Sequence, residues 1–425
     1  MPPDTPPSRF VALRSRNFRL IWISLLISYS GSRMETAAIL WQVALLAPAG
    51  RKGLALGMVG LVRVVPIVVF SMLSGVAADA YDRRRMMLVT QSVMTVFAAA
   101  LAWLTFRGLS ALWPIYLLAA LTSAANAFDM PARQALYPNL VPREHLPNAI
   151  SLNTIMFQIA SVIGPSLAGI VIAALGIGWA YAFNTASFLA VLVALLMMRN
   201  VPGQALTAAD GEKRLSLRAA IDGFRFVFAS PTIRSTMLLD FFATFFSSAM
   251  TLLPIFAQDI LHVGASGYGW LYAAPSVGAL LAGGLMVRIV DGIDRRGAVL
   301  IGAVGVYGVA TVLFGLSRDF WLTFACLALV GASDTVSTVL RNIVRQLETP
   351  DHIRGRMTGV NMIFFLGGPQ FGEMEAGLVA NWLGAPFSVV TGGIGCIAAT
   401  AWVVAATPAL RRYRREDAPD AEARL

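Results

Sequence analysis

Hydrophobic residues in this chain are gathered into long runs that short polar stretches separate. Most runs hold about twenty residues or more, the length at which an α-helix crosses the hydrocarbon core of a bilayer. The pattern therefore predicts an all-α polytopic membrane protein with twelve transmembrane helices. The runs cover residues 18–46, 57–78, 86–106, 111–136, 148–175, 178–198, 232–260, 266–290, 298–316, 320–343, 359–382 and 386–407.

One polar stretch is much longer than the others and divides the predicted helices into two groups of six. It opens with the charged, loop-like segment NVPGQALTAADGEKR, and apolar residues then lie among Arg218, Asp222 and Arg225, as in a short helix at a membrane surface. We expect five parts: a cytoplasmic tail at 1–17, a six-helix half at 18–198, a cytoplasmic linker with a short amphipathic helix at 199–231, a second six-helix half at 232–409 and a cytoplasmic tail at 410–425.

The two groups of six also share sequence, which indicates an internal repeat. The segment from Asp79 to Arg84 recurs 212 residues later, from Asp291 to Arg296. Further pairs recur in order at a shift of 208 residues: Asn126 with Asp334, Arg133 with Arg341, Pro142 with Pro350, Asn153 with Asn361, Gly164 with Gly372, and Gly169 with Gly377. Parallel halves with a substrate site between them near the membrane midplane are a transporter architecture.

The composition agrees with a chain that faces lipid. Of its 425 residues, 57% are hydrophobic and 13% are charged, whereas an ordinary soluble domain has about 25% charged residues. The net charge is +10, and the basic residues are distributed unevenly between the two sides of the membrane. If both termini lie on one side, the connections on the opposite side hold only Arg51, Lys52, Arg107 and Arg318. Arg33 and Arg63 are the two counted within spans, and all other Lys and Arg residues lie on the side of the termini. The positive-inside rule then places both termini in the cytoplasm, and the basic excess indicates anionic lipid rather than nucleic acid.

Cysteine and histidine are too few and too scattered to build a site. Cys326 and Cys396 lie inside apolar runs, while His145, His262 and His352 lie in connections. We therefore expect no disulfide framework, no metal and no other cofactor. The sequence holds no HExxH motif, nucleotide-binding glycine loop or soluble stretch long enough for a catalytic domain, which argues against an enzyme.

The segment GVAADAYDRRR at 75–85 resembles the loop between helices 2 and 3 of the major facilitator superfamily, whose pattern is G-x-x-x-D-R-x-G-R-R. Four positions match, Gly75, Asp79, Arg83 and Arg84, and two differ, Ala80 and Asp82. The segments FDMPARQALYPNLVPREHLPNA and IGPSLAG resemble the branch that holds the enterobactin exporter and macrolide-type drug exporters. The resemblance covers residues 17–409 and implies the major facilitator fold, with alternating access between two six-helix halves.

The loop motif indicates a latch on the cytoplasmic side. Asp79 lies at the negative C-terminal end of its helix, where a carboxylate is disfavoured unless a positive group meets it. The resemblance implies that the N-terminus of the eleventh helix, near Arg356, meets Asp79, and the repeat implies that Asp291 meets the start of the fifth helix near Asn148. The basic residues would bind neighbouring acids or lipid phosphates; the alternative is a solvated basic turn that only maintains topology. The predicted latch consists of Gly75, Asp79, Arg83, Arg84, Asp291, Arg295 and Arg296.

Gly164, Pro165 and Gly169 resemble GPxxGG, a motif associated with antiporters of the superfamily. Small residues at this spacing let two helices approach closely, and Pro165 kinks its helix. The motif therefore predicts antiport, and tight packing within a membrane bundle is the alternative interpretation.

Charged residues inside the predicted spans are candidates for the substrate path, because a charge is costly in hydrocarbon. The resemblance implies that the first, fourth, seventh and tenth helices line the cavity, and these helices hold Arg33, Glu35, Asn126, Asp240 and Asp334. Arg33 and Glu35 point about 200° apart around their helix, so they cannot both serve one point. We expect Glu35 to be the main protonation site and Asp334 the second, because burial favours a neutral carboxyl. A purely structural polar network is the alternative.

Two ion pairs are predicted. Asp129 and Arg133 are four residues apart on one helix face, near the cytoplasmic end of the fourth helix, and should pair with each other. Arg63 is expected about 9 Å and Glu375 about 10.5 Å inside the outer surface, with Glu373 deeper. The resemblance implies that their helices lie together, so we predict an outer gate in which Arg63 pairs with Glu375 or Glu373. The alternative is that Arg63 extends to the outer headgroups.

These observations predict a proton-coupled exporter of a small organic or amphipathic molecule, monomeric and embedded in the bacterial cytoplasmic membrane. Its partners would be the lipid bilayer, the small-molecule substrate and protons, with no nucleic acid. The alternatives are an uncoupled facilitator or importer of a metabolite, and a transporter-fold receptor or sensor without flux.

Replacing Asp79 by Asn tests the latch. If Asp79 stabilises the state closed to the cytoplasm by about 1–3 kcal/mol, its loss shifts the population toward the inward-open state. Cysteines introduced at the cytoplasmic mouth should then react faster with a thiol reagent. Unchanged labelling together with unchanged transport would leave the motif a role in topology alone.

Overall fold

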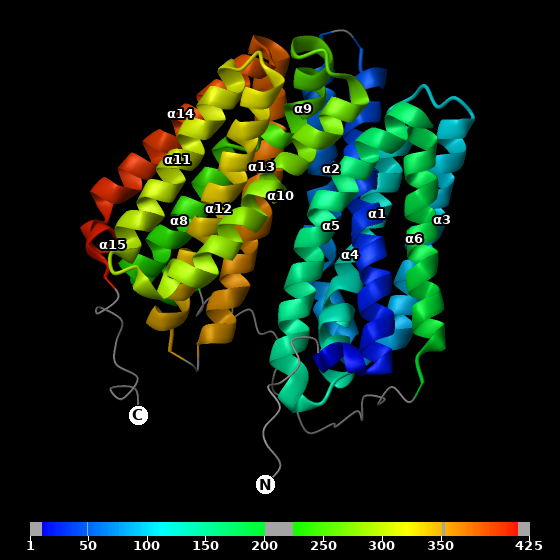
Figure 1. Cartoon of the computed structure of the whole chain (residues 1–425), viewed down its shortest axis with the longest axis horizontal. Coiled ribbons are helices and arrows are strands. Elements are labelled where there is room, and N and C mark those ends of the chain that lie inside the picture. The colour runs from blue at the N-terminus through cyan, green and yellow to red at the C-terminus, as the bar shows by residue number, and fades with distance from the viewer. Residues whose placement is uncertain (1–10, 49, 200–223, 351–352, 415–425) are drawn as a thin grey trace. The chain divides into compact units, whose positions relative to one another are not determined.

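The computed structural model describes residues 11–48, 50–199, 224–350 and 353–414. Within these ranges it leaves undescribed the side chains of 71–73, 75–80, 138, 354–356, 358–359, 362–363 and 365–366. All regular structure in the described residues is helical (Figure 1), which confirms the all-α prediction. The chain separates into two compact units, Met1–Leu46 with Val62–Thr207 and Ala47–Leu61 with Ala208–Leu425.

The first unit is organised around α1 (Arg16–Leu46), which packs against α5 (Leu146–Ala174) and α6 (Ile177–Met197). A second layer pairs α3 (Arg83–Phe106) with α4 (Trp113–Leu136) and with α6. Apolar side chains of α1, α5 and α6 form its main core, since burial among neighbours excludes them from both water and lipid. The other elements are η1 (Val11–Arg14), α2 (Lys52–Ala80), η2 (Tyr137–Asn139) and η3 (Arg143–His145).

The second unit pairs α10 (Gly264–Ile289) with α12 (Phe320–Glu348), and α11 (Arg296–Leu316) with both α12 and α14 (Ala385–Ala406). A further helix, α8 (Pro231–Phe246), packs against α13 (Arg354–Leu383) and α14. The remaining elements are η4 (Ala249–Leu252), α9 (Leu253–Ile255), η5 (Phe256–Ile260), η6 (Val290–Gly292) and α15 (Pro408–Arg412).

The run predicted at 232–260 is an interrupted helix. α8 ends at Phe246, and a 3-10 turn, a short α segment and a π turn follow it. Pro254 has no backbone N–H, so it cannot donate to the carbonyl four residues before it, and the regular ladder breaks near this position. In the π turn, the N–H of Leu261 donates to the carbonyl of Phe256, five residues back, at 2.8 Å.

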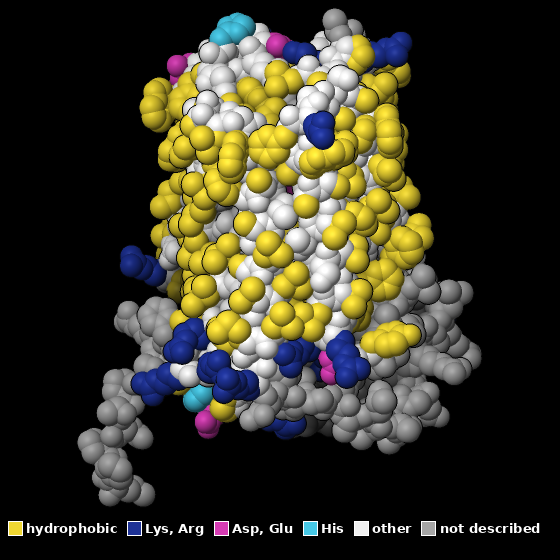
Figure 2. Space-filling view, turned by 90° about the vertical axis from the view of Figure 1, so that its right-hand side faces the viewer, with side chains coloured by type: hydrophobic (Ala, Val, Ile, Leu, Met, Phe, Trp, Pro, Cys, Tyr) yellow, Lys and Arg dark blue, Asp and Glu magenta, His cyan; other side chains and the backbone are white. Residues whose placement is uncertain are grey.

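Nine helical segments of the described residues are long and apolar enough to cross a membrane. On the face drawn in Figure 2, hydrophobic side chains cover a broad middle band, and Lys and Arg side chains gather along its lower edge. Soluble monomers rarely expose apolar surface this continuously. The surface is therefore that of a multi-pass membrane protein, while the count of twelve spans stays a prediction.

α10 and α12 cross at a point where neither helix has room for a side chain. A Cβ added to Gly278 would overlap the carbonyl oxygen of Ala328, and one added to Gly331 would overlap the carbonyl oxygen of Pro275. Glycine here permits direct backbone contact, which is how membrane helices gain packing when lipid supplies no hydrophobic drive between them.

Replacing Gly331 by Val should therefore force α10 and α12 apart. Overpacking of a close contact costs about 1–3 kcal/mol, and the thermal unfolding temperature of the purified protein should fall. Gly302→Ala on α11 is the matched control, because a Cβ there meets nothing within 4 Å. Equal unfolding temperatures for the two variants would contradict the crossing.

Candidate functional site

Glu35 of α1 is buried in the first unit, with 6% of its surface exposed. Asn184 of α6 donates its side-chain N–H to Glu35 Oε2, and Ser187 Oγ donates to Asn184 Oδ1 at 3.0 Å, which fixes the orientation of the amide. Arg63 Nη2 donates to Thr36 Oγ1 at 3.4 Å, which places the guanidinium beside the residue that follows Glu35 on α1. We refer to these five residues as the Glu35 cluster. Glu35 accepts this hydrogen bond from a neutral amide, so proton uptake by Glu35 breaks no ion pair at that contact.

Arg33 points away from the Glu35 cluster. Its Cζ lies 4.9 Å from the ring centroid of Phe157 on α5. Glu35 instead faces α6, so the prediction that two residues of separation turn these side chains to different sides is confirmed.

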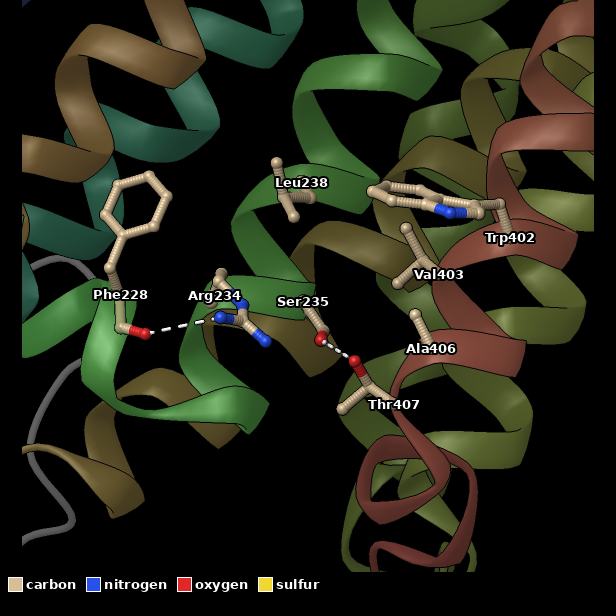
Figure 3. A pocket seen from close by; sticks show the side chains of 8 residues that line it. All are labelled: Phe228, Arg234, Ser235, Leu238, Trp402, Val403, Ala406 and Thr407. Atoms are coloured by element: carbon tan, nitrogen blue, oxygen red, sulfur yellow. Dashed lines mark hydrogen bonds between the residues drawn. The ribbon is translucent and has the colours of Figure 1, made fainter.

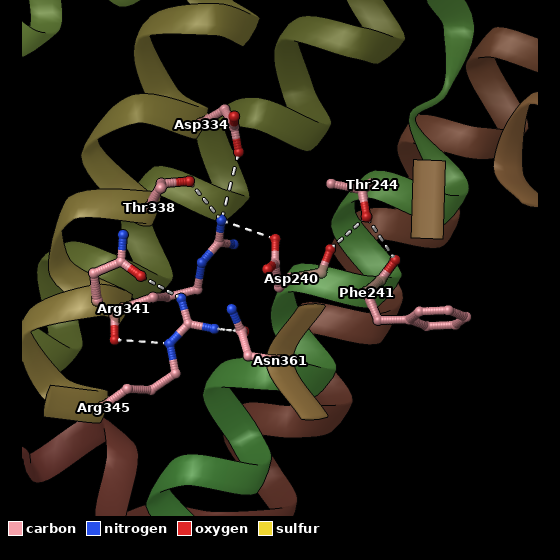
Figure 4. A network of polar contacts seen from close by, with 9 residues as sticks. Asp240, Phe241, Thr244, Asp334, Thr338, Arg341, Arg345 and Asn361 are labelled. Atoms are coloured by element: carbon pink, nitrogen blue, oxygen red, sulfur yellow. Dashed lines mark hydrogen bonds and ion pairs between the residues drawn. The ribbon is translucent and has the colours of Figure 1, made fainter. Parts of the chain in front are cut away.

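Arg341 of α12 is buried between two acids in the second unit (Figure 4). Its Nη2 lies 2.9 Å from Asp240 Oδ1 on α8 and 3.6 Å from Asp334 Oδ1, and it donates to Thr338 Oγ1 at 2.7 Å. The side chains of Arg341 and Asp240 are 2% and 3% exposed, whereas that of Asp334 is 46% exposed. Asp240 is therefore the fixed partner of Arg341, and Asp334 faces accessible space.

A second buried guanidinium, that of Arg345, lies one turn further along α12. Arg345 Nε donates to the carbonyl of Arg341 at 3.2 Å, Nη2 donates to Asn342 Oδ1 at 2.7 Å, and Nη1 donates to Asn361 Oδ1 on α13. These partners are all neutral oxygens. We refer to Asp240, Asp334, Arg341, Arg345 and Asn361 as the Arg341 cluster.

Asp129 and Arg133 form a buried ion pair on α4, which confirms the pairing that their spacing predicts. Thr90 Oγ1 and Gln91 Nε2 of α3 donate to Asp129 Oδ1 at 2.8 and 3.0 Å. The ring of Tyr29 on α1 covers the guanidinium, with Arg133 Cζ 4.7 Å from the ring centroid. This pair is enclosed by its own unit and ties α3, α4 and α1 together.

The cytoplasmic latch is only partly within the described residues. The side chains of Gly75 and Asp79 lie outside them. Arg83 Nη1 donates to the carbonyl of Ala135 at 2.8 Å, and Arg84 Nε donates to the carbonyl of Leu195 at 2.8 Å. These carbonyls lie in the last turns of α4 and α6, where backbone oxygens lack helical partners, so the arginines cap helix ends in place of the acids or phosphates expected for them.

The repeat of this motif, from Asp291 to Arg296, lies between α10 and α11 in the second unit. Asp291 and Arg295 are exposed, while Arg296, the first residue of α11, is 7% exposed. The latch across the two halves stays a prediction.

The antiporter-like motif packs α5 against α1. Gly164, Pro165 and Gly169 are buried, and a Cβ on Gly164 would lie 2.5 Å from both Arg33 Cβ and the carbonyl oxygen of Ser30. The described role of the motif is thus close helix packing, and antiport stays a prediction.

The residues of the outer gate fall in different units. Arg63 lies in the first unit beside Thr36, and Glu373 and Glu375 are half-buried on α13 of the second. Within the second unit, a Cβ on Gly60 would lie 2.6 Å from Glu373 Oε2. The pairing of Arg63 with either acid stays a prediction.

A crevice of about 330 Å³ lies between α8 and α14 (Figure 3). Its walls are mostly apolar, and its hydroxyls satisfy each other, because Ser235 Oγ donates to Thr407 Oγ1 at 2.7 Å. A specific ligand site needs a few polar groups that converge on the ligand. The two buried polar clusters meet this need better than the crevice does.

Sequence reasoning missed several members of these clusters. The predicted run at 320–343 ends just after Arg341 and before Arg345, so neither was expected to be buried, but α12 continues to Glu348 and buries both. The repeat had already aligned Arg341 with Arg133, and this alignment was the available signal. Asn184 gave no signal, since a neutral amide in an apolar helix resembles any packed polar residue. Asn126 is exposed on α4 and belongs to neither cluster.

Known families and proteins include relatives of this chain. A family model described as "Transmembrane secretion effector" matches residues 7–422. The enterobactin exporter EntS of Escherichia coli is 28% identical over 348 residues, which is 81% of each chain. The same exporter from Citrobacter koseri is 27% identical over 403 residues, covering 94% of this chain and 93% of the relative.

Solved structures show the same fold at low sequence identity. An inward-facing bacterial homologue of the human lysosomal transporter Spinster superposes with a TM-score of 0.70 at 16% identity, covering 93% of this chain and 98% of that one. An inward-facing bacterial homologue of the iron transporter ferroportin gives a TM-score of 0.70 at 14% identity, covering 94% and 99%.

Removing Asp240 tests whether it is the fixed partner of Arg341. Asp240→Asn leaves a buried guanidinium without its counter-charge, which should cost about 3–5 kcal/mol and lower the thermal unfolding temperature markedly. Asp334→Asn removes a partly exposed acid at a longer distance and should cost no more than about 1 kcal/mol. Similar losses in the two variants would contradict this assignment.

Proposed function

This chain belongs to the transmembrane secretion effector family of the major facilitator superfamily, and from that premise we propose that it is a proton-coupled exporter of a small organic molecule. Membership makes it a membrane transporter and not an enzyme. As a multi-pass protein related to a bacterial exporter, it works in the cytoplasmic membrane and handles a small molecule there.

The proposal includes the finer architecture. Twelve spans form two six-helix halves at 18–198 and 232–409, joined by a linker at 199–231, and both termini lie in the cytoplasm. The halves alternate access to a site between them, and the protein acts as a monomer. The named relatives support export and suggest enterobactin as the first substrate to test.

The observation that carries proton coupling is the environment of Glu35. Glu35 is almost fully buried and accepts its hydrogen bond from a neutral amide. Protonation removes the cost of a buried charge and breaks no ion pair at that contact, so the neutral form is accessible. Arg63 supplies a counter-charge through which the surroundings can stabilise the deprotonated form. The Glu35 cluster can therefore exist in both protonation states, as a carrier of protons must.

The energy available from one proton is sufficient for export. A charge moving through 100 mV of membrane potential gains about 2.3 kcal/mol, which drives roughly fifty-fold accumulation. The sequence holds no nucleotide-binding glycine loop, so the gradient is the energy source in this proposal.

Glu35→Gln should abolish transport driven by a proton gradient in proteoliposomes, because glutamine keeps the shape of the side chain and removes its titration. Glu144→Gln is the matched control: it is the same chemical change at a side chain that is 74% exposed. Substrate exchange without a gradient should survive in Glu35→Gln, which separates lost coupling from lost folding.

Three results would contradict the proposal in different ways. Undiminished gradient-driven transport in Glu35→Gln would exclude Glu35 as the main proton site. Flux of the wild-type protein without proton movement would indicate an uncoupled facilitator. Substrate binding without any flux would indicate a receptor or sensor.

A further inference from the structure

The Arg341 cluster has hydrogen-bond donors that its own acids do not use. Nη2 of Arg341 makes the contacts with Asp240, Asp334 and Thr338. Its Nε and Nη1 are buried and donate to no oxygen of the described residues. Buried polar groups are normally hydrogen-bonded, and a guanidinium left with free donors is costly. Nη1 forms the end edge of the fork together with Nη2, the atom that contacts Asp334. An acceptor that takes the place of Asp334 can therefore receive hydrogen bonds from both atoms of that edge.

The two acids beside Arg341 are not equivalent. Asp240 is almost fully buried at 2.9 Å, the distance of a charge-assisted hydrogen bond. Asp334 lies at 3.6 Å, and nearly half of its side chain is exposed. This separation is longer than a charge-assisted hydrogen bond, and the acid has accessible space into which it can turn. Asp334 can therefore leave Arg341 at small cost, while Asp240 cannot.

The distribution of charge in the cluster leaves one guanidinium open to an anion. Two guanidiniums and two carboxylates balance overall, but Arg345 is buried and donates only to neutral oxygens of the described residues, so it has no acid in contact. When Asp334 turns away, Arg341 and Arg345 together face a single fixed carboxylate. Figure 4 shows the two guanidiniums one above the other, with Asp240 beside that of Arg341 and Asn361 beside that of Arg345.

The repeat offers an internal comparison. Arg133, which aligns with Arg341, is paired with Asp129 and covered by the ring of Tyr29. Both arginines are buried, with side chains 8% exposed at Arg133 and 2% exposed at Arg341. The difference lies in their acids, because Asp129 is fully buried whereas Asp334 beside Arg341 is 46% exposed.

We propose that Arg341 and Arg345 bind the carboxylate, or a similar planar oxyanion, of an organic anion, and that Asp334 occupies this position until the anion displaces it. The guanidinium fork matches planar oxyanions in particular. Asp334 is itself a carboxylate, so the site already accommodates the group it is proposed to bind. The inference rests on the proposed transport function, because it assigns an acidic class of cargo to the same protein.

Binding of benzoate to the purified full-length protein tests the site, with benzamide as the neutral probe of the same shape. The rise of the unfolding temperature with ligand concentration gives the apparent Kd. Wild-type protein should bind benzoate and not benzamide. Arg341→Gln should weaken benzoate binding by at least about tenfold, the loss expected for a charge-assisted hydrogen bond, and Arg341→Lys should also weaken it, because an ammonium lacks the fork.

Asp334→Asn provides the decisive arm, since it predicts a gain. Removal of the competing carboxylate should tighten benzoate binding, and this result does not depend on a variant that risks unfolding. Arg288→Gln, an exposed arginine of α10, is the control for loss of one positive charge in the same unit. It should bind benzoate like the wild-type protein.

The proposal is overturned if wild-type protein fails to distinguish benzoate from benzamide, if a folded Arg341→Gln variant binds benzoate with unchanged Kd, or if Asp334→Asn weakens binding. These outcomes are separable from the transport proposal. Enterobactin flux without benzoate binding would remove the anion site alone, whereas benzoate binding without any flux would keep the site and remove the transport function.

Discussion

An arginine inside an apolar helical bundle needs hydrogen-bond acceptors for its guanidinium, and Asp240 supplies a charged one to Arg341 across two helices. The acid is on α8 and the guanidinium on α12, so the ion pair fixes the register of one helix against the other. Arg345 extends the constraint to α13 through Asn361. A buried pair is costly to desolvate and far more costly to break. Two polar contacts of α12 thus help to fix the arrangement of three helices.

Where α12 meets α10, close packing requires the absence of side chains and involves no charge. There the contact is between backbones, and Gly278 and Gly331 make it possible by having no side chain. α12 therefore carries direct backbone packing on one side and the Arg341 cluster on another. The contact with α10 tolerates no added side-chain volume. On the side that carries the Arg341 cluster, the buried guanidiniums instead need acceptors and counter-charges. The two faces of one helix give it a rigid side and a side whose contacts can change when an acid moves.

The sequence predicted the helical class, the repeat and several buried charges, because apolar run length and cost of charge in hydrocarbon act locally. It did not predict the break near Pro254 or the partners of Arg83 and Arg84. The partners of Arg83 and Arg84 are backbone carbonyls of other helices, and the spacing of residues along the chain does not indicate which carbonyls will lie nearby. Glu35 was identifiable as a costly mid-span acid, but Asn184, which donates to it, was not. Single charges are visible in a sequence, while their partners on other helices are not.

The repeat explains what the two halves share and also where their chemistry differs. Arg133 and Arg341 align, yet one pairs with Asp129 on its own helix and the other with Asp240 on a neighbour. At either shift of the repeat, Glu35 and Asp240 align with small residues in the opposite half. Each half also adds buried acids that its counterpart lacks, Glu35 and Asp129 in the first and Asp240 in the second. A proton carrier in one half and an anion-binding arginine in the other would need this asymmetry, because two identical halves would offer the same chemistry twice.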